Sequence, residues 1–324
     1  MIKKPILKVD GNYHGRIPGL VMTNKGTLLG YYESRENFHD WGNIDIKVIR
    51  STDKGENWTE TYTIPSNGNT MNNPVMIVNG DEIVLLYNEN YNRLFVCKSY
   101  DDGITFESPK EITDIFDKAG ITRHCIAVGP GHGIVHNGTL LAPMWFSYDP
   151  DDPKAHWPSW VTTIYSKDGG DTWQLGEVIG KDIIKSPNES ALAVTKDNKI
   201  FISMRNMDEY QHRAISVSDN GYSGWETPVF CDNLPDPMCM GSLDTIDKIM
   251  YHINCDMTTN NFFTGRKNLT IKISDDKFKT YDKILVDEEG GYSDLAVTDD
   301  AIYVFYERDV HHDGLYFAKI NRPR

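Results

Sequence analysis

Three arginines stand at the ends of strand-like runs that lie far apart in this 324-residue chain. Arg16 precedes one such run, Arg205 ends a second, and Arg266 opens a third. A guanidinium group stays charged and binds a carboxylate through two parallel hydrogen bonds. Taken singly, each arginine is more typical of a surface ion pair. If the fold brings the strand ends together, the three would hold one small anion.

A turn motif recurs along the chain, with the pattern Ser-x-Asp-x-Gly-x-x-Trp or a degraded form of it. Its copies cover residues 51–58, 99–106, 166–173, 218–225 and 274–281. The Asp side chain can accept bonds from the backbone N–H groups that follow it, and Gly adopts the positive φ of the turn. In the fourth copy we place Asp219 as the motif aspartate, with one residue fewer after Ser218. Five unrelated hairpin turns are the alternative, but order and flanking strands argue against it.

The spacing of the motif, about 50–65 residues, predicts a propeller or a solenoid array. Strand-like runs bounded by Gly, Asn and Asp dominate, and helical periodicity is weak. We therefore expect an all-β fold, a six-bladed β-propeller of four-stranded antiparallel sheets, built as one domain over 1–324. Five motif copies mark five blades, and the two chain ends would complete the sixth.

Two segments depart from the strand pattern. Residues 112–118 are the best candidate for a short helix. Residues 148–158 are too rich in Pro and Asp for a strand interior, so we expect a long loop between strands there. That loop either borders a site or is an ordinary surface loop.

Composition and charge exclude several classes of function. The hydrophobic fraction of 39% and charged fraction of 25% are those of an ordinary globular protein. No apolar run approaches the roughly 18–20 residues of a membrane span. The net charge of −14 argues against nonspecific binding of nucleic acid. The first residues resemble no signal peptide, so the sequence as it stands predicts a cytoplasmic protein, or a secreted one if an upstream signal was removed.

The cysteines and histidines give no metal motif. The five cysteines show no metal-ligand spacing, and we expect buried free thiols in a reducing compartment. His311 and His312, beside Asp313, are more typical of a solvated turn. We therefore expect neither a metal nor a cofactor.

Several short segments, in order along the chain, resemble the exo-α-sialidases, which are six-bladed propellers with Asp-box repeats. They are Arg16-Ile17-Pro18, 26–29, 33–35, 40–45, 129–134, 188–190, 204–206, 266–270, 291–296 and 306–307. The Asp boxes alone also occur in noncatalytic propellers, but all these segments in family order are highly specific. The resemblance covers nearly the whole chain.

The resemblance implies a role for each site residue. Arg16, Arg205 and Arg266 would bind the carboxylate of a sialoside, and Glu307 would hold Arg16 by an ion pair. Asp40 would be the general acid/base. Tyr292 would be the nucleophile, with Glu189 as the base that takes its proton. A neutral phenol suits this role because the substrate carboxylate would repel an anionic nucleophile, and sialidases are the glycosidases that use Tyr. A free phenol has a pKa near 10, so it needs such a base.

Some assignments keep rivals. Asp45 competes with Asp40 for the acid role. Glu189 is also suited to a structural ion pair with an arginine and can do both. Tyr292 is suited to core packing as well, but Gly290 and Gly291 before it favour a close approach of the backbone. Arg35 is a further substrate-binding candidate, and Asn73 stands where some family members have an aspartate that faces a sugar hydroxyl. The candidates for an N-acyl pocket are Tyr87, Tyr91, Met144 and Trp145.

The function that follows is a retaining exo-α-sialidase, which releases terminal sialic acid from sialylated glycans or sialosides. One alternative is the same chemistry on another nonulosonic acid, such as a deaminated sialic acid. The other is a noncatalytic glycan-binding propeller, which has no need of Asp40, Glu189 and Tyr292 together. Linkage preference and oligomeric state stay open.

Overall fold

The computed structural model describes residues 1–7, 13–259, 265–308 and 314–323. The described residues form 26 strands and a single helix, α1 (Asp114–Lys118), within the segment predicted to be helical. None of the described helical structure is long and apolar enough to cross a membrane. His311 and His312 lie outside the described residues.

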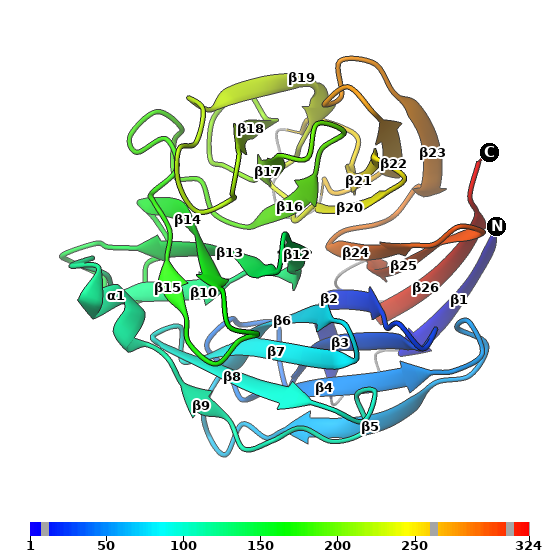
Figure 1. Cartoon of the computed structure of the whole chain (residues 1–324), viewed down its shortest axis with the longest axis horizontal. Coiled ribbons are helices and arrows are strands. Elements are labelled where there is room, and N and C mark those ends of the chain that lie inside the picture. The colour runs from blue at the N-terminus through cyan, green and yellow to red at the C-terminus, as the bar shows by residue number, and fades with distance from the viewer. Residues whose placement is uncertain (8–12, 260–264, 309–313, 324) are drawn as a thin grey trace.

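The strands form six sheets around a central axis, as Figure 1 shows, and the predicted six-bladed propeller is confirmed. The first sheet contains β2 (His14–Met22), β3 (Leu28–Arg35), β4 (Ile44–Ser51) and β5 (Thr59–Ile64). The second contains β6 (Met71–Asn79), β7 (Glu82–Glu89), β8 (Arg93–Ser99) and β9 (Lys110–Glu111). The third contains β10 (Cys125–Val128), β13 (Thr139–Ser147), β14 (Ser159–Ser166) and β15 (Gln174–Leu175).

The remaining three sheets complete the ring. The fourth contains β16 (Ser190–Val194), β17 (Ile200–Met204), β18 (His212–Ser218) and β19 (Val229–Pro235). The fifth contains β20 (Ser242–Ile246), β21 (Ile249–Cys255), β22 (Leu269–Ser274) and β23 (Asp282–Asp287). The sixth contains β24 (Ser293–Val297), β25 (Ala301–Arg308), β26 (Gly314–Asn321) and β1 (Ile2–Leu7).

Two sheets carry a short fifth strand that the four-stranded prediction did not include. In the second sheet β11 (Gly131–His132) pairs with β6 in parallel, and in the third sheet β12 (Ile134–His136) pairs with β13. The short segment 131–136 therefore crosses from one sheet to the next near the axis and ties the two together.

Both chain ends meet in the sixth sheet, as predicted. Strand β1 pairs antiparallel with β26, and Figure 1 shows the N- and C-terminal labels side by side. The first residues of the chain thus supply the outer strand of the last blade. This pairing closes the ring.

The five turn motifs follow the third strand of the first five sheets. In the copy 166–173, the Ser166 hydroxyl donates to Asp168 Oδ1 at 2.7 Å, and Gly170 N donates to Ser166 Oγ at 2.8 Å. The indole N–H of Trp173 then donates to Gly170 O at 3.0 Å. The motif is a self-contained turn that fixes its aromatic residue to the sheet.

The fourth copy differs from the prediction. Asn220, and not Asp219, occupies the aspartate position, since its Oδ1 accepts bonds from the N–H groups of Tyr222 and Ser223, each at 2.9 Å. Compared with a full copy of the motif, one residue fewer separates Asn220 from Gly221. Asp219 instead forms an ion pair with Lys199 at the surface.

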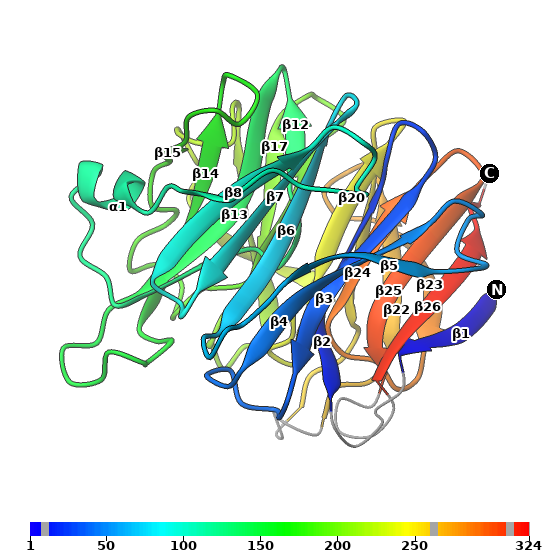
Figure 2. The ribbon, with the colours of Figure 1, turned by 90° about the horizontal axis from the view of Figure 1, so that it is seen from below.

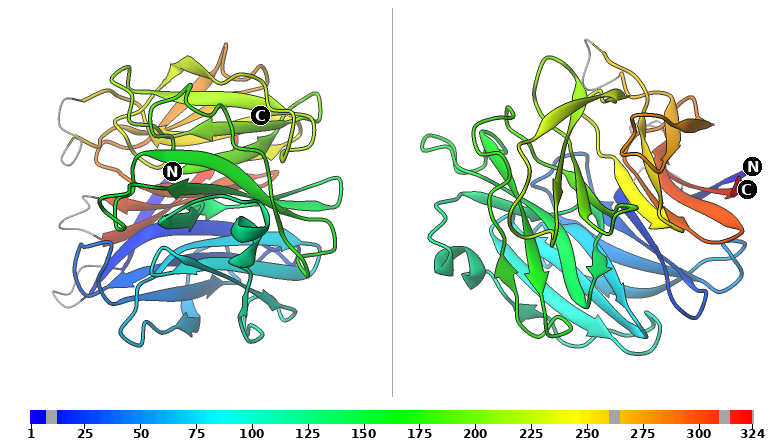
Figure 3. Two further views of the ribbon diagram at one scale, coloured as in Figure 1. Left: turned by 90° about the vertical axis from the view of Figure 1, so that its left-hand side faces the viewer. Right: turned by 45° about the horizontal axis from the view of Figure 1, so that its top comes forward.

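The core consists of apolar clusters between neighbouring blades. Six clusters each combine buried side chains mainly from two adjacent sheets, so the ring has one such layer at every junction. Figures 2 and 3 show the sheets from the side, packed face to face. All five cysteines are unpaired and buried, as expected. Rigid junctions of this kind hold the loops at the strand ends in fixed positions.

Candidate active site

A cavity of about 700 Å³ lies where the six blades converge, and every sheet or its loops contributes to the wall. Arg16 comes from β2, Arg205 directly follows β17, and Arg266 precedes β22. The three arginines predicted to meet therefore do meet, in one cavity. Tyr292 is the residue directly before β24, and its side chain lines the same cavity.

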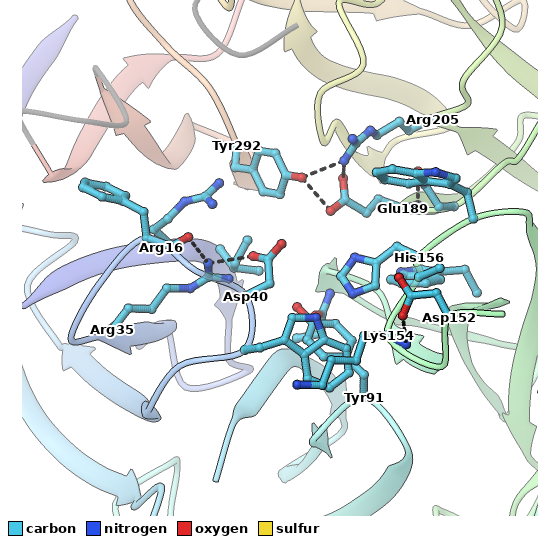
Figure 4. A pocket seen from close by; sticks show the side chains of 18 of the residues that line it. Arg16, Arg35, Asp40, Tyr91, Asp152, Lys154, His156, Glu189, Arg205 and Tyr292 are labelled. Atoms are coloured by element: carbon cyan, nitrogen blue, oxygen red, sulfur yellow. Dashed lines mark hydrogen bonds and ion pairs between the residues drawn. The ribbon is translucent and has the colours of Figure 1, made fainter. Parts of the chain in front are cut away.

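Tyr292, Glu189 and Arg205 form a closed set of contacts on one side of the cavity (Figure 4). The phenol of Tyr292 donates to Glu189 Oε1 at 2.6 Å, and Arg205 Nη1 donates to the Tyr292 oxygen at 2.7 Å. Arg205 also pairs directly with Glu189. The carboxylate is therefore placed to accept the phenolic proton, while the arginine faces the oxygen that would lose it.

Two further arginines lie near the Tyr292 ring. The guanidinium carbons of Arg16 and Arg266 lie 5.2 and 4.9 Å from its centroid. Burial raises the pKa of Tyr292 well above its ordinary value, although Arg205, Arg266 and Arg16 each act to lower it. The phenol is thus neutral, and losing its proton requires a base beside it.

Arg16 is fixed by Glu307, as the resemblance implied. Arg16 Nε donates to Glu307 Oε1 at 3.1 Å and Nη2 to Oε2 at 3.3 Å. Glu307 also accepts from the N–H of Ile17 at 2.9 Å, and it lies behind the cavity wall. The carboxylate orients Arg16 without itself facing the cavity.

Arg266 keeps unused donors. Its Nη2 donates to Met238 O at 3.3 Å, its Nε is buried without a hydrogen-bond partner, and the described residues give it no ion pair. Arg205 Nε is likewise buried without a partner. Buried donors left unsatisfied are costly, so a ligand that accepts from them binds strongly. Because these donors belong to cationic guanidinium groups, this end of the cavity suits an anion.

Arg35 and Asp40 occupy the opposite side of the cavity (Figure 4). Arg35 has only 1% of its side chain exposed, and its Nε donates to Glu33 Oε2 at 2.7 Å. Its Nη1 donates to Asp40 Oδ1 at 2.8 Å. Burial acts to raise the pKa of Asp40, but the charges of Arg35 and Arg16 outweigh it, and the pKa lies below its ordinary value.

Asp45 and Asn73 also have defined places. Asp45 lies on β4 outside the cavity, where its Oδ1 accepts from Ser66 N at 2.7 Å, so it does not compete with Asp40 on position. Asn73 lines the cavity at a bulge in β6 with φ +53°. Its N–H donates to Glu33 Oε1 at 2.7 Å, which leaves its side chain to the cavity and to Asn72.

Of the four candidates for an N-acyl pocket, Tyr91 and Trp145 line the cavity, whereas Tyr87 and Met144 lie in inter-blade clusters. His156 packs between the two, with ring centroids 4.7 Å from Tyr91 and 5.3 Å from Trp145. Trp145 Nε1 and His156 Nε2 are buried without hydrogen-bond partners. This aromatic corner therefore offers polar atoms to a ligand.

Sequence reasoning missed several wall residues. Phe38, Trp41, Asp149, Asp152, Lys154, Ala155, His156, Trp157 and Asn188 also line the cavity. Most belong to the loop 148–158, whose unusual composition was the available signal. Arg213, a fully buried cation in β18, was also missed; it donates to Asp236 Oδ2 at 3.0 Å and to Glu189 O at 3.3 Å. The sequence signal for Arg213 was a charged residue inside an apolar strand.

Comparison with known proteins shows the family to which the chain belongs. Residues 26–304 match the model of the BNR repeat-like domain. The chain belongs to the BNR repeat-like family. The relation to sialidases predicted from the sequence motifs is confirmed at the level of the family.

This BNR repeat-like protein is similar to several sialidases. It is 30% identical to a sialidase of Bacteroides fragilis over 96% of this chain and 63% of that protein. It is 28% identical to an exo-α-sialidase of Arthroderma benhamiae over 94% of this chain and 80% of that one. The solved structure of the Hadza microbial sialidase Hz136 matches with a TM-score of 0.80 and 27% identity, over 95% of this chain and 66% of that chain. The chain thus spans less than two thirds of the length of the first and the third.

Proposed function

We propose that this protein is a retaining exo-α-sialidase that uses Tyr292 as its nucleophile. The observation that carries the proposal is the phenol of Tyr292 donating to Glu189 at 2.6 Å, inside a ring of three arginines. The similarity to sialidases supports the substrate class. Binding alone needs no base beside a buried phenol.

The carboxylate of a sialoside is the ligand that Arg16, Arg205 and Arg266 suit. Each presents charged donors to the cavity, and those of Arg205 and Arg266 include the unpaired Nε atoms. Holding the carboxylate fixes the adjoining anomeric carbon near Tyr292. Positioning of this kind makes the displacement effectively unimolecular.

Proton transfer then accompanies bond formation. The Tyr292 oxygen attacks the anomeric carbon, its proton passes to Glu189, and the bond to the leaving oxygen breaks. Because burial keeps the phenol neutral, Glu189 acts as general base in this step and as general acid when the tyrosyl intermediate is hydrolysed. Two displacements at one carbon retain its configuration.

Asp40 is the proposed acid for the leaving oxygen. In the empty site Arg35 and Arg16 keep its pKa low. A bound carboxylate offsets the charge of Arg16 and so raises the pKa of Asp40. Substrate binding thereby prepares the carboxyl group to give its proton.

A panel of fluorogenic α-glycosides tests this function. It contains N-acetylated and deaminated nonulosonic acids and a neutral hexoside as a control. We expect turnover of the N-acetylated substrate, with the α-anomer as the first product in proton NMR. Turnover of the deaminated substrate alone would assign deaminated sialic acid as the substrate. Binding without turnover would indicate a noncatalytic glycan-binding propeller.

A further inference from the structure

A second hollow of about 470 Å³ adjoins the cavity and shares Trp41 and Lys154 with it. Trp41 follows the proposed acid Asp40 in the chain. The Thr70 hydroxyl donates to Gly42 O at 2.6 Å and so ties this loop to the wall of the hollow. This space, which we call the outer groove, therefore lies beside the loop that carries Asp40.

The outer groove has an unusual charge for this protein. It is lined by Trp41, Gly68, Thr70, Asn90, Asn92, Arg123, His124, Pro153 and Lys154. Among these described residues there are two permanent cations and no carboxylate. The whole chain, by contrast, carries a net charge of −14. Local cationic walls attract anions.

Lys154 is the more available of the two cations. Its ammonium lies 5.0 Å from the centroid of the Trp41 ring, and Lys154 lines both the groove and the cavity, where Figure 4 labels it. The neighbouring Asp152 accepts from the backbone N–H of Lys154 at 2.9 Å. No described carboxylate forms an ion pair with the ammonium itself. Arg123, by contrast, already donates to Asp117 at 2.8 Å.

We propose that the outer groove is a subsite for a leaving group that itself carries a negative charge, with Lys154 as its main contact. The inference rests on the proposed sialidase function and names its preferred substrates: glycans in which the released sugar is joined to a second acidic sugar. The anion is either the carboxylate of another nonulosonic acid or a sulfate ester. Both offer the same acceptor oxygens.

The test compares kcat/KM for three substrates with the same terminal sialic acid. Their leaving groups are a neutral galactoside, the same galactoside with a sulfate ester, and a second sialic acid. We expect an acidic leaving group to be preferred. Lys154→Met should lower the ratio of acidic to neutral kcat/KM by roughly fivefold, as expected for an exposed charge pair. The preference should also weaken as salt is raised.

Lys167→Met is the matched control. Its ammonium also lies over an aromatic ring, 4.7 Å from the centroid of Tyr222, but in the turn motif at the far end of β14. It should leave the ratio unchanged. Arg123→Gln, in the groove but outside the cavity, should lower the ratio less than Lys154→Met, and thermal unfolding checks that each variant is folded.

The possible outcomes separate the two proposals. Preference for the disialoside alone assigns the groove to a carboxylate, and preference for both acidic substrates assigns it to anions in general. Equal use of all three substrates, unaffected by Lys154→Met, overturns the subsite while the sialidase function stands. Failure to cleave any sialoside overturns both.

Discussion

At the scale of single residues, the proposed chemistry depends on the protonation states of Tyr292 and Asp40. Tyr292 is kept neutral by burial and Asp40 is kept ionised by Arg35 and Arg16. Tyr292 reacts from this neutral form, because Glu189 takes the phenolic proton as the new bond forms. In our account the substrate carboxylate changes the protonation of Asp40 alone: it offsets the charge of Arg16, and Asp40 then gains a proton.

A prediction for Asp40 follows from this difference. For alkyl sialosides, whose leaving groups need a proton, activity requires Asp40 in its acid form and falls as pH rises through its pKa. The profile of kcat/KM reports the free protein and that of kcat the complex. Because the low pKa of Asp40 belongs to the empty site, the alkaline limb of kcat should lie at higher pH than that of kcat/KM. Coincident limbs would contradict the account.

The same residue should show a dependence on the leaving group. Asp40→Asn should lower activity on alkyl sialosides by about 10²–10⁴-fold and on activated aryl sialosides much less. Asp45→Asn, whose carboxylate accepts from Ser66 outside the cavity, should leave that dependence unchanged. Equal losses on both substrate types would assign Asp40 a binding role instead.

At the scale of elements, four of the five turn motifs are held by a carboxylate, and Asp168 is one of the four. Bonds from the Thr172 hydroxyl, the Thr172 N–H and the Ser166 hydroxyl lower the pKa of Asp168 to about 2. A pKa lowered by folding contributes stability above the unfolded value, near 4, and loses it as pH falls toward 2. The turns therefore favour folding at neutral pH and less so in acid.

Asp168→Asn should lower the midpoint of thermal unfolding by about 2 °C at pH 7. The difference from the unsubstituted protein should shrink as pH falls from about 5 toward 2, because the unfolded carboxyl gains its proton near pH 4 while the native one stays ionised down to about pH 2. Asp219→Asn is the matched control, since Asp219 forms its ion pair with Lys199 at the surface and does not hold the turn. A deficit that stays constant with pH would argue against the titration of Asp168 as its cause.

The strands and loops also show which features could be predicted from the sequence and which could not. The recurring motif predicted the blades because its hydrogen bonds are local. Adjacent strand residues point to opposite faces, so Met144 packs into the junction with the second blade and Trp145 into the junction with the fourth, where it also lines the cavity; composition does not distinguish them. The loop 148–158 was recognised, but the contacts of His156 and Lys154 depend on segments more than 50 residues away, such as Tyr91 and Trp41.

At the scale of the whole molecule, the ring is closed by the junction between the first and sixth blades. Gly55, in the first turn motif, lies against Phe317 of β26, which also packs on Trp58 with ring centroids 5.4 Å apart. A Cβ atom at Gly55 would lie 2.2 Å from Phe317. Glycine is needed here for space as well as for its φ of +90°.

Gly55→Ala should therefore destabilise the protein more than Gly26→Ala. Both glycines have positive φ, but a Cβ at Gly26 meets nothing within 4 Å. The positive φ costs alanine about 1 kcal/mol or more at either place. Overpacking should add about 1–3 kcal/mol at Gly55 alone, measured by denaturant unfolding. Equal losses would mean that the closing junction adapts freely.

The central claim is the covalent bond to Tyr292, and one measurement addresses it directly. A fluorinated sialosyl donor, slow to be released, is incubated with the protein, and the digest is mapped by mass spectrometry. We predict a sugar on the peptide that follows Lys283 and ends at Arg308, located by fragmentation at Tyr292, and its absence in Tyr292→Phe. An adduct on Glu189 or Asp40 instead would contradict the account.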